Sequence, residues 1–128
     1  MNVKGVPVVH VVEDDTDVRT GFTRLLRSAG LEVHAYASAA RFLDEVDRVK
    51  PGCILLNIMM PGIREPEPLK VLMGRRSSLP LIVVSTLDTG AVQRFASELD
   101  AKMFLRKPVD DQALLDAISW VTRPPLDR

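Results

Sequence analysis

The 128-residue sequence predicts an α/β fold in which a five-stranded parallel sheet carries helices on both faces. Three observations lead to this prediction. Short runs rich in valine, isoleucine and leucine alternate five times with longer amphipathic runs. Several of the short runs are apolar throughout, as in central parallel strands that are covered on both sides. The length suits one domain with its own core, and no segment repeats or has low complexity.

The first part of the chain begins with a predicted strand at residues 6–12, which is almost entirely apolar. The helix that follows can be capped by Asp15 or Thr16 and is stopped by Gly30, because glycine readily takes the left-handed conformation that ends a helix. Residues 31–37 alternate between apolar and polar side chains, which predicts a strand nearer to an edge of the sheet.

The middle of the chain predicts a second helix, a third strand and a third helix. Ser38 can cap a helix at residues 39–49, and a buried strand follows at residues 53–57. The third helix is expected to be short and to begin near Pro68, since proline is tolerated in the first turn of a helix.

The last part of the chain adds two further strand–helix units. The pattern predicts a buried strand at residues 79–85, a helix at residues 89–100, a strand at residues 101–107 and a closing helix at residues 109–121. We expect Trp120 to pack its apolar face in the closing helix.

Polar side chains follow four of the five predicted strands. Parallel sheets place their ligand and reaction sites at the carboxyl ends of the strands, so we expect these side chains to gather at one edge. They comprise three acids after the first strand, an amide after the third, two hydroxyls after the fourth and a lysine after the fifth: Glu13, Asp14, Asp15, Asn57, Ser85, Thr86 and Lys107.

This set of side chains suits a phosphoryl group beside a metal ion, but it lacks a nucleophile. Clustered carboxylates repel one another unless a cation compensates, and oxygen ligands suit Mg²⁺. Lys107 and a hydroxyl can neutralise phosphoryl oxygens. A carboxylate can form an acyl phosphate, whereas the uncharged amide of Asn57 cannot, because its nitrogen lone pair is delocalised.

Four segments together resemble the response-regulator receiver domain (CheY-like), and more narrowly the FixJ-type receivers. They are "VVEDD", "LLNIMMPG", "LIVVS" and "FLRKP", and "SAARFL" adds to the similarity with the FixJ-type group. The resemblance covers residues 6–121. It implies a flavodoxin/CheY-like (βα)5 fold and a non-enzymatic receiver module of two-component phosphorelay signalling. We expect residues 1–121 to form this domain and residues 122–128 to form a polar, proline-rich tail or the start of a linker.

The resemblance also implies a role for individual residues. Asn57 stands at the phosphoacceptor position. Glu13 and Asp14 would hold Mg²⁺, helped by the backbone carbonyl of Met59. The helix at residues 89–100 and the strand at residues 101–107 would form the signalling surface. The positions that contact the phosphoryl group or switch on activation fall on Ser85, Thr86, Phe104 and Lys107.

The sequence departs from the receiver pattern at three places. Asn57 removes one negative charge from the metal site, so Mg²⁺ binding is expected to be weak or absent. The loop "GIREPEPLK" carries Arg64 and Glu65 where receivers usually have an Asp-Gly or Asn-Gly pair, and its prolines predict a shorter or displaced third helix. Thr86 follows the switch hydroxyl and would narrow access to the site.

These departures leave several interpretations open. The leading one is a phosphorylation-independent pseudo-receiver that acts by docking a partner or by dimerising. The alternative is an ordinary phospho-accepting receiver that carries an engineered Asp-to-Asn substitution at position 57 and was cut from a transcription regulator. A distant third is a small flavodoxin-like nucleotide-binding enzyme, although the segment "EDDTDV" has no glycine to cradle a phosphate.

Composition limits the partners and the location. Lys plus Arg and Asp plus Glu both total 17, which argues against a chain-wide basic surface for nucleic acid or membrane. The single cysteine, Cys53, excludes an intrachain disulfide and lies in an apolar run typical of an inert buried thiol. With no leader or spanning segment predicted, we expect a cytoplasmic protein whose partner is a histidine kinase, another signalling protein or a second copy of the chain.

Overall fold

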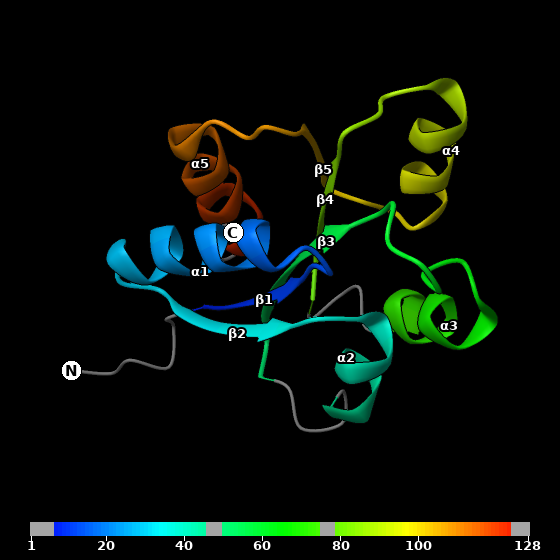
Figure 1. Cartoon of the computed structure of the whole chain (residues 1–128), viewed down its shortest axis with the longest axis horizontal. Coiled ribbons are helices and arrows are strands. Elements are labelled where there is room, and N and C mark those ends of the chain that lie inside the picture. The colour runs from blue at the N-terminus through cyan, green and yellow to red at the C-terminus, as the bar shows by residue number, and fades with distance from the viewer. Residues whose placement is uncertain (1–6, 46–49, 75–78, 124–128) are drawn as a thin grey trace, which may run out of the picture.

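The computed structural model describes residues 7–45, 50–74 and 79–123, and in these ranges it confirms the predicted α/β fold (Figure 1). All strands run parallel, in the order β2-β1-β3-β4-β5. The strands are β1 (Val8–Val12), β2 (Glu32–Tyr36), β3 (Gly52–Asn57), β4 (Leu81–Ser85) and β5 (Met103–Arg106). The helices are α1 (Thr16–Ser28), α2 (Ala39–Glu45), α3 (Pro66–Gly74), α4 (Gly90–Glu98) and α5 (Asp111–Thr122).

Two apolar cores lie on opposite faces of the sheet. One contains Leu26 of α1 and Leu114 of α5. The other contains Phe42 of α2, Leu72 of α3 and Phe95 of α4. Helices α1 and α5 therefore cover one face, and α2, α3 and α4 cover the other, which Figure 1 shows as two groups on either side of the strands.

Burial along the strands matches what their sequences predicted. Every residue of β1 and β4 is buried, because these strands have neighbours and helices on both sides. In β2, Val33 and Tyr36 are buried while Glu32 and Ala35 are exposed, in keeping with its position at the edge of the sheet. Strand β3 is the middle strand, so its last residue, Asn57, lies at the centre of the carboxyl edge.

Helix starts agree with the predicted caps. The Asp15 side chain accepts from the Val18 backbone N–H at 3.0 Å, and the Ser38 hydroxyl accepts from the Arg41 backbone N–H at 3.1 Å. Helix α3 begins at Pro66 rather than Pro68. The ends predicted for the second and third helices fall on residues 46–49 and 75–76, which lie outside the described residues.

The prediction for Trp120 is wrong, because its side chain is 54% exposed. The buried stripe of α5 consists of Leu114, Ala117 and Ile118. Trp120 stands two residues beyond Ile118, which is more than half a helical turn away, so it points outward.

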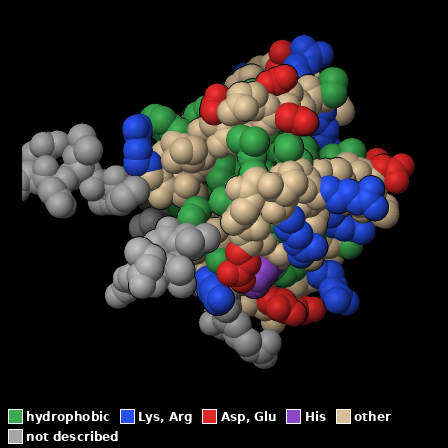
Figure 2. Space-filling model, turned by 90° about the vertical axis from the view of Figure 1, so that its left-hand side faces the viewer, with side chains coloured by type: hydrophobic (Ala, Val, Ile, Leu, Met, Phe, Trp, Pro, Cys, Tyr) green, Lys and Arg blue, Asp and Glu red, His purple; other side chains and the backbone are tan. Residues whose placement is uncertain are grey.

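The surface carries charges of both signs. On the face drawn in Figure 2, acidic and basic side chains surround a cluster of hydrophobic ones, and no single basic stripe crosses this face. Among the described residues, no helix is both long enough and apolar enough to cross a bilayer.

Candidate functional site

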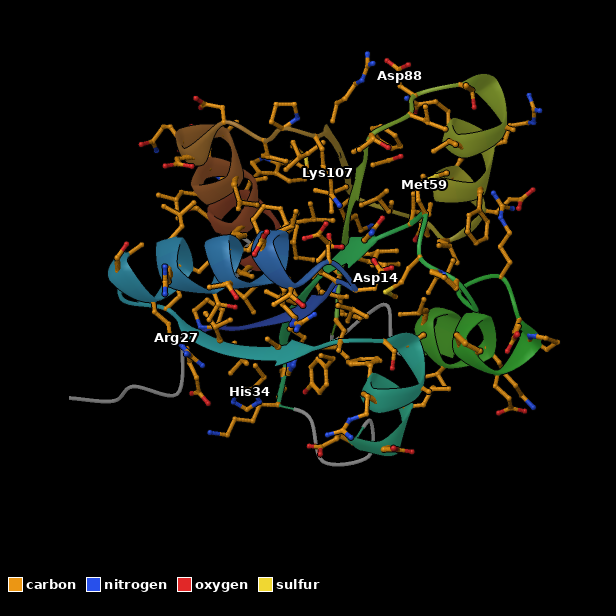
Figure 3. All side chains as sticks on the ribbon, in the orientation of Figure 1. Asp14, Arg27, His34, Met59, Asp88 and Lys107 are labelled. Carbon is orange, nitrogen blue, oxygen red and sulfur yellow. The ribbon has the colours of Figure 1, made fainter. Side chains whose placement is uncertain are left out.

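Polar side chains from β1, β3 and β5 meet at the carboxyl edge of the sheet. Figure 3 shows Asp14, Met59 and Lys107 near one another, although they follow three different strands. Strand order explains the meeting, because β1 and β4 flank β3 and β5 lies one strand further out. The predicted gathering of polar residues at this edge is therefore present in the structure.

Glu13 is the buried centre of the cluster, with a side chain that is only 1% exposed. One carboxylate oxygen, Oε1, accepts a hydrogen bond from Lys107 Nζ at 2.7 Å. The other, Oε2, accepts from Asn57 Nδ2 at 2.9 Å and from the Asp15 backbone N–H at 3.1 Å. A buried carboxylate needs such partners, and here both of its oxygens are engaged.

The Asn57 amide joins the two acids to the loop that follows β3. Its nitrogen donates to Asp14 Oδ1 at 3.1 Å as well as to Glu13, and its oxygen accepts from the Met59 backbone N–H at 2.9 Å. The chemistry fixes this orientation. If the amide were turned over, its oxygen would face two carboxylates and its NH₂ group would face an N–H donor.

In this cluster the carboxylate oxygens have hydrogen-bond donors, but their negative charge is not fully neutralised. Two carboxylates, Glu13 and Asp14, face one ammonium, Lys107, and one neutral amide, so a net negative charge remains. Asp14 is exposed, which lets water screen that charge. The oxygens that would face a bound cation accept N–H hydrogens in this arrangement.

The remaining predicted site residues make other contacts, and Phe104 lies within β5 rather than at its carboxyl end. The buried Ser85 hydroxyl accepts from the Leu87 backbone N–H at 3.0 Å, which closes the turn after β4. Thr86 is exposed and lines a groove of about 450 Å³ that Lys107 also lines. Phe104 is half-buried and packs against the core under α4. The Met59 side chain is 44% exposed.

Arg19 is a neighbour of the site that the sequence analysis missed. Its Nη1 donates to the backbone carbonyl of Glu13 at 2.9 Å. Its position four residues after the Asp15 cap was the available signal, because a long side chain one helical turn into α1 can reach back to the end of β1.

The family is decided by a profile comparison. The family described as "Response regulator receiver domain" matches residues 9–119. The chain belongs to this receiver family. Receiver domains of response regulators are generally non-enzymatic signalling modules that interact with histidine kinases, can dimerise and typically bind Mg²⁺ at the phosphorylation site.

Relatives place this receiver close to the FixJ type. It is 40% identical over 110 residues to the transcriptional regulatory protein FixJ of Azorhizobium caulinodans. This alignment covers 86% of the present chain and 52% of that FixJ protein. With the transcriptional regulatory protein TdiR of Thauera aromatica it shares 34% over 111 residues, covering 87% of this chain and 49% of that protein. The chain thus spans about half the length of the curated relatives it matches. Because these relatives are named as transcriptional regulators, the expectation that this domain binds no nucleic acid stays a prediction.

Solved structures agree with this assignment. A response regulator receiver protein from Burkholderia phymatum superposes with a TM-score of 0.79 at 33% identity, covering 94% of this chain and 99% of that one. Full-length FixJ from B. japonicum gives a TM-score of 0.81 at 29% identity, covering 92% of this chain and 60% of that one. The predicted receiver fold and its FixJ-type similarity are confirmed.

Proposed function

We propose that this chain is a receiver module whose acceptor position is closed to phosphorylation, and that it signals by docking a partner or by dimerising. The observation that carries the proposal is the Asn57 amide, which bridges both acids and the loop after β3. An amide has no charged oxygen to attack phosphorus, so no aspartyl phosphate forms at position 57.

The same contacts argue against a bound magnesium ion. Both oxygens of Glu13 and one of Asp14 accept hydrogen bonds from nitrogen donors, so the residues fit Mg²⁺ poorly as they stand. In this proposal the amide hydrogens of Asn57 take the place of the cation, and Mg²⁺ binds weakly or not at all.

The other site residues then have structural roles at rest. Lys107 neutralises Glu13 rather than a phosphoryl group, and Ser85 stays in its turn with Leu87. Thr86 and Phe104 stand at positions that switch on activation in the receiver family, but in this proposal no phosphoryl group at position 57 triggers them. The proposed domain comprises residues 1–121, followed by residues 122–128 as a tail or linker, and a histidine kinase or another signalling protein in the cytoplasm is the proposed partner.

Phosphodonor labelling tests the proposal. The protein is incubated with acetyl phosphate and Mg²⁺ and then weighed intact by mass spectrometry. We expect no phosphate-sized mass gain, and no rise in melting temperature on adding Mg²⁺. A mass gain that maps to Asn57, or a clear stabilisation by Mg²⁺, overturns the proposal.

The Asn57→Asp variant separates two candidate functions. Because Glu13, Asp14 and Lys107 already meet around position 57, an ordinary receiver with an engineered substitution is the second candidate. If the variant gains phosphate in the same assay, the site was trapped or recently lost. If it gains none, the remodelled loop after β3 is itself incompatible with phosphorylation. The genomic codon for residue 57 decides whether the asparagine is native.

A further inference from the structure

Arg64 contacts helix α4 from the loop between β3 and α3, the segment where the sequence departs from the receiver pattern. The central carbon of its guanidinium group lies 3.9 Å from the centre of the Phe95 ring. This distance is typical of a cation–π contact, in which the positive group is attracted to the face of the ring. Phe95 is only 5% exposed, so its ring is fixed by the core beneath it.

Consecutive hydrogen bonds link this loop back to Asn57. The Met59 backbone N–H donates to the Asn57 side chain at 2.9 Å, and the Met60 backbone N–H donates to the Asn57 carbonyl at 3.4 Å. The Ile63 backbone N–H then donates to the Met60 carbonyl at 3.4 Å. Since Met60 and Ile63 are also buried in the core, the loop is held along its length.

Gly62 provides the turn that brings Arg64 toward α4. Its φ of +83° lies in the left-handed region that side chains other than glycine rarely adopt. Its carbonyl accepts from the Glu65 backbone N–H at 3.1 Å, which closes the turn around Arg64. Figure 1 shows the loop leaving β3 and passing between α4 and α3, so it lies beside the helix that Arg64 contacts.

A second charged contact holds the start of α4. Arg106 on β5 donates to Asp88 at 3.2 Å, just before the Thr89 cap of the helix. Both side chains of this pair are more than half exposed, so it contributes little by itself. The contact of Arg64 with Phe95 differs from the Arg106–Asp88 pair because one of its two partners, the Phe95 ring, is buried and held in place by the core.

We propose that Arg64 is a positioning residue that ties α4 to the loop built on Asn57. The helix is then held in one place without any phosphoryl group. This inference rests on the proposed function, since it supplies what an unphosphorylated receiver needs in order to present a constant α4 surface. The inference rests on the contact between the Arg64 guanidinium group and the Phe95 ring.

Amide hydrogen exchange of peptides covering residues 90–98 tests the contact. We expect Arg64→Ala to speed exchange in α4 by about threefold or more, because Arg64 itself is exposed and the lower range of cation–π strengths therefore applies. Arg64→Lys keeps the charge and should restore part of the protection. Arg94→Ala, which removes an exposed arginine on α4 itself, is the matched control and should leave exchange within about twofold.

Two double-mutant comparisons test the mechanism. Phe95→Leu removes the aromatic ring but leaves an apolar side chain that can pack in the core. In this background Arg64→Ala should no longer accelerate amide exchange in α4. Asn57→Ala should speed amide exchange in α4 of the parent protein, and it should do so by a smaller factor in the Arg64→Ala variant. Equal exchange in the parent and Arg64→Ala overturns the inference, as does an unchanged Arg64 effect without the ring. Either result leaves the phosphodonor assay unaffected, so the two proposals fail separately.

Discussion

At the scale of single residues, the difference between a carboxylate and an amide at position 57 decides the chemistry of the site. The amide brings two N–H hydrogens, and the structure directs them at Glu13 and Asp14. A carboxylate there would add a third acceptor and a further negative charge, which would require a cation. Asn57 thus satisfies the acids from within the protein.

Cys53 shows how burial alone changes the pKa of a side chain. It is fully buried in the core under α1 and α5, and burial raises the pKa of its thiol from 9.0 to about 12. The predicted inert thiol is consistent with this environment, because the reactive thiolate is suppressed at neutral pH.

Alkaline titration should reveal this burial. A raised folded-state pKa means that stability is full below about pH 9 and is lost as the pH rises toward 12, by about 4 kcal/mol in total. Urea unfolding measured from pH 8 to pH 11 should therefore show a steeper decline for the parent than for Cys53→Ala. Tyr36, whose pKa burial also raises, contributes to both proteins and cancels in the comparison. Parallel curves would contradict the prediction.

At the scale of elements, local sequence signals predict most of the helix starts that the structure shows. Asp15 and Ser38 cap the first two helices as their positions predicted, and Thr89 and Asp110 cap α4 and α5. Helix α3 begins two residues earlier than predicted, because both Pro66 and Pro68 are compatible with a first helical turn and the sequence alone does not rank them.

Loss of the α5 cap should have a measurable and specific cost. The Asp110 carboxylate accepts from the Ala113 backbone N–H at 3.0 Å, so Asp110→Ala should lower the free energy of unfolding by about 1 kcal/mol. Asp111→Ala, one residue further on, removes only a favourable charge in the first turn and should cost a few tenths of that amount. Equal losses in urea unfolding would show that the cap hydrogen bond does not matter.

At the scale of the whole molecule, the ion pair between Glu13 and Lys107 connects residues that are 94 positions apart. It joins the end of β1 to the residue after β5 across the sheet. Neither residue has this partner until the five strands have assembled in order, so the pair belongs to the folded domain alone.

Breaking this pair should destabilise the domain more than removing both charges. Lys107→Met leaves a buried carboxylate without its ammonium, which we expect to cost about 3 kcal/mol in urea unfolding at neutral pH. Adding Glu13→Gln removes the stranded charge and should recover about 1 kcal/mol or more. If the double variant is the less stable of the two, Glu13 draws its stability from contacts other than Lys107.

Local patterns were enough to predict the α/β fold, the element types and the edge at which Glu13, Asp14, Asn57 and Lys107 gather, because hydrophobic period, caps and strand ends are local properties, and the family resemblance added the receiver assignment. Which atoms pair at that edge depends on the folded chain. The direction of the Asn57 amide, the reach of Arg19 and Arg64, and the exposure of Trp120 depend on distances between segments that are remote in the chain. Those distances are set by how helices pack on the twisted sheet, and no local pattern records them.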